Sequence, residues 1–173
     1  MTVRRQPRAE RPHMPGYGVD TPEWSPLPWS WAAERLAGNR NYWLITASGD
    51  ARPHAMPVWG VWDDDDLAFA FSCGPRARKA RNLRDNPFVV FTVDDTEECL
   101  SIEGQARVVQ ADETRQDLWI ERYLDKYRSM APDLSGDFLR ENLVVEVVPD
   151  RAFAIIERED DFSRRATRWV FDD

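Results

Sequence analysis

The chain has 173 residues, of which 42% are hydrophobic and 12% aromatic, and its formal net charge is -8. This length and composition indicate one domain with a packed core and exclude a wholly disordered chain. The acidic balance argues against a general nucleic-acid binder, which needs a basic surface, so we expect no nucleic-acid partner.

The beginning of the chain is rich in proline. Residues 1–28 hold six prolines and two glycines, and each proline fixes φ and removes a backbone donor. We therefore predict a flexible, extended arm over residues 1–28, followed by a single domain over residues 29–173. Trp24 and Leu27 are the side chains expected to attach the end of the arm to the domain.

The domain is predicted to consist of short strands interrupted by helices. The run WSWAAERLA, residues 29–37, predicts a helix with Ser30 as its N-cap, and residues 113–130, with one apolar face, predict the longest helix. Short strands with hairpin spacing favour a mainly β fold, an antiparallel barrel or sandwich, over a parallel α/β sheet. The strands are expected at residues 42–47, 53–62, 67–72, 88–93, 100–109, 143–148, 152–156 and 167–171, with a short turn or helix at 160–164.

A basic segment stands out in this acidic chain. Residues 71–84 read FSCGPRARKARNLR, in which Gly74 and Pro75 predict the start of a helix. Cations at a helix N-terminus are unfavourable unless an anion lies against them, so the segment predicts a phosphate or carboxylate site. The alternative is a solvated basic face, or one paired with acidic side chains such as the aspartates at 63–66. The five cations are Arg76, Arg78, Lys79, Arg81 and Arg84.

Other classes of site and location have little support in the sequence. Cys73 and Cys99 are the two cysteines, and they form neither a disulfide framework nor a metal motif. The basic N-terminus is not followed by an apolar run, and no segment is long and apolar enough to cross a bilayer. We expect a cytoplasmic protein with no membrane partner and no metal site.

The order of these features resembles a known family. RPHAMPVWGVW, an acidic turn, LAFAFS, GPRARKARNLRDNPFVVF and LSIEGQARVV follow one another as in the pyridoxamine 5′-phosphate oxidase-like, FMN-binding split β-barrel superfamily. Within it, the form of the basic helix is most similar to the flavin/deazaflavin oxidoreductases that use coenzyme F420. The likeness covers residues 29–111 well and the closing ATRWVF more weakly. It implies a six-stranded antiparallel split β-barrel that forms a homodimer, with two cofactor sites at the interface.

The resemblance also implies which residues bind the cofactor, F420 or alternatively FMN. Basic and hydroxyl side chains hold the phosphate, part of one strand flanks the ring, and the terminal strand closes the site. Asn82 is expected either to donate to the cofactor tail or to cap its helix. The implied phosphate group is Arg52, Ser72, Arg78 and Lys79, the ring is flanked by Val58, Trp59 and Gly60, and the closing residues are Arg168 and Trp169.

The implied activity is hydride transfer between the cofactor and a small organic substrate. The cofactor carries this chemistry, so we expect no catalytic side chain, and His54 is open between proton transfer and a structural hydrogen bond. Two alternatives remain: an FMN-dependent oxidase or reductase, and a non-catalytic flavin- or haem-binding protein on the same barrel. Pyridoxamine 5′-phosphate is not the expected substrate, because the terminal ATRWVFDD lacks the Arg-Leu-His type motif of the true oxidases.

Overall fold

The computed structural model describes residues 6–111 and 113–171, which contain eight strands and five helices. The strands are β1 Arg8–Glu10, β2 Asn41–Ala47, β3 Pro53–Asp63, β4 Ala68–Cys73, β5 Phe88–Thr92, β6 Glu98–Val108, β7 Leu143–Ile156 and β8 Thr167–Val170. The helices are α1 Trp29–Gly38, α2 Arg78–Asp85, α3 Thr114–Tyr127, α4 Gly136–Arg140 and α5 Glu159–Arg165.

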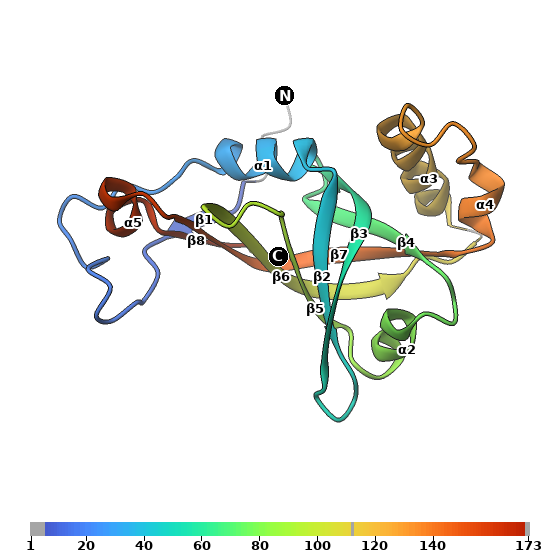
Figure 1. The fold of residues 1–173 in the computed structure, drawn as a ribbon, viewed down its shortest axis with the longest axis horizontal. Coiled ribbons are helices and arrows are strands. Elements are labelled where there is room, and N and C mark those ends of the chain that lie inside the picture. Colours follow the sequence, from blue (N-terminus) through green and yellow to red (C-terminus); the bar gives the residue numbers. More distant parts are fainter. Residues whose placement is uncertain (1–5, 112, 172–173) are drawn as a thin grey trace.

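Six strands close into an antiparallel barrel. They follow the order β7-β4-β3-β2-β5-β6, and β6 pairs back with β7. The first half of β7, from Leu143 to Val147, pairs with β4, and its second half pairs with β8 along the same edge. The short strand β1 extends this second half by pairing with β8 (Figure 1). The predicted mainly β, six-stranded split barrel is therefore confirmed.

Aromatic rings fill the inside of the barrel. The rings of Phe69 and Phe91 stack with centroids 4.2 Å apart, and Tyr42 packs edge-on against Phe69 at 4.8 Å. Gly60 lies directly over Phe69, and a Cβ at this position would overlap the Phe69 ring. The strand therefore needs glycine here for the core to pack. At one end of the barrel α1 inserts Trp29, whose ring lies 5.5 Å from that of Trp169.

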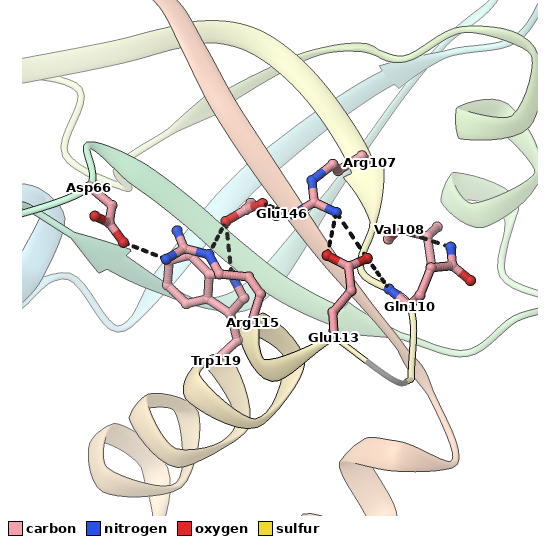
Figure 2. Close-up of polar contacts among 8 residues, drawn as sticks. All are labelled: Asp66, Arg107, Val108, Gln110, Glu113, Arg115, Trp119 and Glu146. Atoms are coloured by element: carbon pink, nitrogen blue, oxygen red, sulfur yellow. Dashed lines mark hydrogen bonds and ion pairs between the residues drawn. The ribbon is translucent and has the colours of Figure 1, made fainter.

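Helix α3 covers the outside of the barrel over β3, β4 and β7. It buries an apolar face that includes Trp119, Ile120 and Tyr123. Its first turn is fixed by the carboxylate of Glu146 on β7, which is buried and accepts hydrogen bonds from Trp119 Nε1 at 3.0 Å and Arg115 Nε at 2.5 Å (Figure 2). The predicted amphipathic helix thus packs through its apolar face, as its sequence pattern indicates.

Several local predictions were wrong. Helix α1 starts one residue before Ser30, and the position before the helix is Pro28, which makes no side-chain capping bond. Helix α2 starts at Arg78, because the segment from Gly74 to Ala77 forms a turn closed by the bond from Ala77 N to Gly74 O at 2.9 Å. The strand β1 within the proline-rich arm and the helix α4 were not predicted.

The two strands expected at 143–148 and 152–156 form one continuous strand, β7. Pro149 is accommodated because the pairing with β6 slips between Glu103 and Gly104. A Cβ on Gly104 would stand 3.0 Å from the Cα of Pro149 and would overlap the carbonyl oxygen of Val148. The glycine lets the two backbones approach, so the proline bends the strand without ending it.

Candidate functional site

The barrel is split where β3 and β4 diverge. Strand β4 pairs with β3 only from Gly60 to Asp63, so the first half of β3, Pro53–Pro57, has no strand partner on its β4 side. The turn after β4 and helix α2 follow at this end of the barrel, and α2 lies beside the protruding β2–β3 hairpin (Figure 1). The free edge of β3 and the start of α2 form the candidate site.

The cations of α2, and Arg76 in the turn before it, have no carboxylate partner in the part of the chain that the structure describes. Among the described residues, Arg78 and Lys79 make no hydrogen bond or ion pair through their side chains, and no ion pair involves Arg76, Arg81 or Arg84. The first turn of α2 also contains no acidic residue. The described residues therefore do not support the alternative in which these cations pair with acidic neighbours.

The aspartates of the β3–β4 turn are paired elsewhere. Asp63 forms an ion pair with Arg122, and Asp66 forms one with Arg115, both from α3. Glu103 on β6 forms an ion pair with Arg151 at 3.4 Å. Asp63, Asp66 and Glu103 are thus paired with arginines outside α2.

Two arginines of α2 fold back toward its start. Arg81 donates to the carbonyl of Arg76 at 3.2 Å, and Arg84 donates to the carbonyl of Pro75 at 3.4 Å. These contacts bring their guanidinium groups to the turn that precedes Arg78. Four arginines and Lys79 therefore gather around the N-terminal end of α2, where the helix dipole is already positive. Such a group is stabilised by a bound anion.

A buried hydrogen bond holds α2 on the barrel. The side-chain amide of Asn82 donates to the hydroxyl of Thr46 on β2 at 2.9 Å, and both residues are buried. Asn82 thus holds α2 on the barrel, and its contact with a cofactor tail stays a prediction. Arg52 lies in the β2–β3 turn, whose Gly49 packs against Asp85 at the opposite end of α2. Arg52 is exposed, and its guanidinium forms no ion pair with any described residue.

His54 lies on β3 between these groups. It pairs across the ladder with Thr46, and its Nδ1 atom is buried without a hydrogen-bond partner among the described residues. Burial lowers the pKa of the imidazole, and the positive charges of Arg78 and Lys79 lower it further. The side chain is therefore neutral near pH 7, with one buried nitrogen unsatisfied, beside two unpaired cations.

The segment expected to flank the cofactor ring is covered by α3. Val58 is buried inside the barrel, and the Trp59 ring stacks on Tyr127 with centroids 4.6 Å apart and planes 2° apart. The backbone N–H of Gly60 donates to the Tyr127 hydroxyl at 2.8 Å, and its carbonyl accepts from Lys126 Nζ at 2.9 Å. In the described chain these three positions are used for packing, and the free part of β3 lies before them.

Lys126 is a residue of this region that the sequence reasoning missed. Its ammonium also donates to the hydroxyl of Tyr42 at 2.8 Å and lies 4.9 Å from the Tyr42 ring centroid. Burial lowers the pKa of Lys126 to about 8, and it raises the pKa of Tyr127 to about 12. The scarcity of lysine in the chain was the available signal, because Lys79 and Lys126 are its two lysines.

Ser72, Arg168 and Trp169 are not brought to the cations of α2. Ser72 lines the small space under α3 together with Tyr123 and Leu139. Arg168 and Trp169 lie on β8, which pairs with the second half of β7, whereas β4 pairs with the first half. Arg168 forms an ion pair with Glu10 of β1, and Trp169 is fully buried in the core. Within one chain, the predicted set therefore divides into a group at α2 and a distant pair.

An open cavity of about 330 Å³ lies near the C-terminal end of α2. It is lined by the outward side of β2, β5 and β6, including Ile45, Phe88 and Val90, with Glu103 and Arg151 among its charged residues. Asn86, which follows α2, is also part of its wall. The cavity offers an apolar surface close to the basic helix.

Two further kinds of site were searched for in the described residues. No group of three or more His, Cys, Asp or Glu side chains there is arranged to hold a metal ion. No helix in the described part of the chain has the length and apolar character needed to cross a membrane.

Several solved structures are similar to this chain. The HutZ haem storage protein of Vibrio cholerae is 20% identical, with a TM-score of 0.60 over 75% of this chain and 95% of its own. A conserved hypothetical protein of Mycobacterium tuberculosis is 20% identical, with a TM-score of 0.64 over 80% of this chain and 89% of its own. An F420 reductase is 21% identical, with a TM-score of 0.53 over 69% of this chain and 94% of its own.

These structural likenesses show a shared fold. No curated protein matches the chain. The model of the pyridoxamine 5′-phosphate oxidase family, in contrast, matches residues 32–155, which include the whole barrel up to the second half of β7. The chain therefore belongs to the pyridoxamine 5′-phosphate oxidase family.

Proposed function

We propose that this protein binds the deazaflavin coenzyme F420 through the cations of α2 and uses it to transfer hydride to a small organic substrate. The observation that carries the proposal is the group of five cations without a carboxylate partner at the N-terminal end of α2. In a chain of net charge -8 such a group is best explained by an anionic ligand.

The donors present fit the tail of such a cofactor. Lys79 and the neighbouring arginines supply charge-assisted hydrogen bonds. Five cations exceed what one terminal phosphate needs, and this favours F420, whose tail carries carboxylates beyond its phosphodiester, over FMN. The cofactor, once bound, supplies the hydride chemistry.

The remaining tasks belong to the chain itself. The α2 cations hold the tail, the bond between Asn82 and Thr46 keeps α2 in place, and the free edge of β3 offers backbone groups to a flat ring. Helix α3 closes the adjoining backbone at Gly60 to water. No side chain needs to act as a nucleophile, because the cofactor, once bound, supplies the hydride chemistry.

A second copy of the chain is proposed to complete the site. Trp43 on β2 and Phe88 on the neighbouring β5 point outward, with 45% and 60% of their surface exposed. Together with the open cavity lined by β2, β5 and β6, they form an apolar face. We expect a homodimer through this face. Sedimentation should find a dimer that Trp43→Asp dissociates, whereas Phe138→Asp on the exposed side of α4 leaves it intact.

Ligand titration tests the proposed function. The protein is titrated with F420 and, in parallel, with FMN, while the fluorescence of the ligand is followed. The double variant Arg78→Ala, Lys79→Ala loses two charged donors, each worth about 1.5–3 kcal/mol, so the dissociation constant should rise roughly 10²–10⁴-fold. The control Arg140→Ala, Arg164→Ala removes the same charge from exposed positions paired with Asp117 and Glu23, and its affinity should match that of the parent.

The outcomes separate the candidate functions. Tighter binding of F420 that depends on α2 supports the proposal, and turnover of reduced F420 with small unsaturated or aromatic compounds then tests the hydride transfer. Tighter binding of FMN would assign the site to a flavin enzyme. Binding of neither, or an affinity unchanged in the α2 variant, would refute the site, and a Soret band on addition of haem would indicate a haem-binding protein instead.

A further inference from the structure

A hollow of about 250 Å³ lies between the N-terminal arm and the outward face of β6, β7 and β8. Its floor includes one row of side chains from three neighbouring strands, because Ser101 pairs with Phe153 and Phe153 pairs with Arg168. The residues on either side of these in each strand are buried in the core, so the row faces outward. Residues 12–14 of the arm supply the other wall.

The arm is held over this row at several points. Strand β1 pairs with β8, and later in the arm the indole Nε1 of Trp24 donates to the carbonyl of Ala166 at 2.8 Å. The backbone N–H of Leu27 donates to Thr167 Oγ1 at 2.9 Å, and Val19 is 1% exposed. The arm therefore runs beside β8 and α5 (Figure 1), and the hollow beneath it is a formed part of the structure.

The lining of the hollow combines positive charge with apolar surface. Arg151 and Arg168 are its cations, and Glu103 is the one carboxylate among the described residues that line it. Phe153 from the floor and Met14 from the arm are half-buried and offer apolar contacts. The lining is thus positive in a chain of net charge -8. Such a surface fits a flat apolar ring that carries one carboxylate.

Arg151 is the cation best placed to bind this carboxylate. Its Nε atom lies 3.4 Å from Glu103, and the two side chains are 58% and 56% exposed. An exposed ion pair of this kind contributes little to stability, so the guanidinium can turn to a ligand at small cost. Arg168, in contrast, is held by Glu10 of β1 through both Nε and Nη2, so its main contribution is its charge.

We propose that this hollow is a second ligand site, which binds a small aromatic carboxylate with the carboxylate on Arg151 and the ring on Phe153. No residue of α2 lines the hollow, so the proposal stands apart from the proposed function. Pockets for drug-sized ligands have volumes of about 300–1,000 Å³. The hollow is smaller than this range, which restricts the occupant to a single ring.

Benzoate is the probe for this site, and NMR of the protein is the measurement. The chain has two histidines, and His13 lines the hollow whereas His54 does not. His13→Gln identifies the His13 imidazole signal by its loss. Benzoate at millimolar concentration should shift this signal in a saturable way and leave the His54 signal in place. Benzyl alcohol, which has the ring but no charge, should bind at least about tenfold more weakly.

Arg151→Gln tests the cation assigned to the carboxylate. It removes a charge-assisted donor, so the dissociation constant of benzoate should rise by about tenfold or more. Arg140→Gln is the matched control, because it removes an exposed guanidinium on α4 that pairs with Asp117 and does not line the hollow. Its affinity for benzoate should equal that of the parent. Thermal unfolding midpoints close to the parent's establish that both variants fold.

The outcomes separate this site from the cations of α2. The double variant Arg78→Ala, Lys79→Ala should bind benzoate as the parent does. Loss of benzoate binding in that variant would move the ligand to α2 and overturn the proposal. A His13 signal that does not shift, or equal affinities of Arg151→Gln and the parent, would also overturn it, and neither result bears on cofactor binding at α2.

Discussion

Glu146 offers the sharpest test of how α3 is held on the barrel. Its side chain is 5% exposed and receives three donors: Arg115 Nε at 2.5 Å, Arg107 at 2.8 Å and Trp119 Nε1 at 3.0 Å (Figure 2). The Glu146→Gln substitution keeps the volume but removes the charge, and it directs an amide N–H₂ at a guanidinium donor. Two arginines then lose their buried counter-charge.

The expected loss follows from this geometry. Breaking a buried, hydrogen-bonded ion pair by changing one partner costs about 3–5 kcal/mol. For a chain of this length each kcal/mol moves the thermal midpoint by about 2–4 °C, so Glu146→Gln should lower it by roughly 6–20 °C. Urea denaturation, followed by tryptophan fluorescence, gives the free energy of unfolding directly.

The control makes the same chemical change at an exposed carboxylate. Glu113 pairs with Arg107 at 3.0 Å but keeps 33% of its side chain exposed, so Glu113→Gln should lower stability far less than Glu146→Gln. Equal effects of the two substitutions would show that burial of Glu146 does not determine its contribution, and the account of α3 docking would fail. A cooperative transition in both variants is needed for the comparison.

Two further substitutions test the core and the lysine under α3. Gly60→Ala places a methyl group into the Phe69 ring, so it should lower the free energy of unfolding, measured by urea denaturation, by at least about 1–3 kcal/mol. Gly38→Ala is the control, because a Cβ there meets nothing within 4 Å, and it should leave the free energy of unfolding unchanged. Equal losses in the two variants would contradict the packing argument. In the folded chain the pKa of Lys126 is lowered to about 8, whereas in the unfolded chain it is about 10.4. Between pH 8 and pH 10.4 the unfolded chain therefore binds more protons than the folded chain, and the free energy of unfolding should rise with pH. From pH 8 to pH 9.5 we expect the free energy of unfolding to rise by about 1 kcal/mol, which is less than the full pKa difference implies because the side chain is half-buried. Lys126→Met should show no such rise. A free energy of unfolding in the parent chain that does not change over this interval would exclude a buried ammonium.

Much of the barrel could be predicted, because residues that face the core alternate with residues that face outward along its strands. In β2, Tyr42 and Leu44 point inward while Trp43 points outward, and this alternation is visible without any structure. The strand β1 could not be predicted, because its stability comes from pairing with β8 at the opposite end of the chain. Helix α4 has five residues, too few for a periodic pattern.

The candidate site was predictable in part, for a related reason. The basic run is local in sequence, so Arg78 and Lys79 could be proposed as anion ligands from the sequence alone. Which carboxylates pair with which arginines depends on the fold, and so does the covering of Trp59 and Gly60 by α3. The burial of Trp169 in the core likewise depends on tertiary packing, which no sequence motif indicates.

The distribution of charge connects the fold to the proposed function. Most arginines outside α2 are held by carboxylates, as Arg107 and Arg115 are by Glu146 and Arg122 is by Asp63. An anionic cofactor approaching a chain of net charge -8 is repelled at long range, and the unpaired cations of α2 are the local exception. The paired charges on the barrel stabilise the fold, whereas the unpaired cations of α2 are available to bind an anionic ligand. We therefore expect the four cations of α2 and Arg76 in the turn before it, rather than the aromatic residues in the core, to select the ligand.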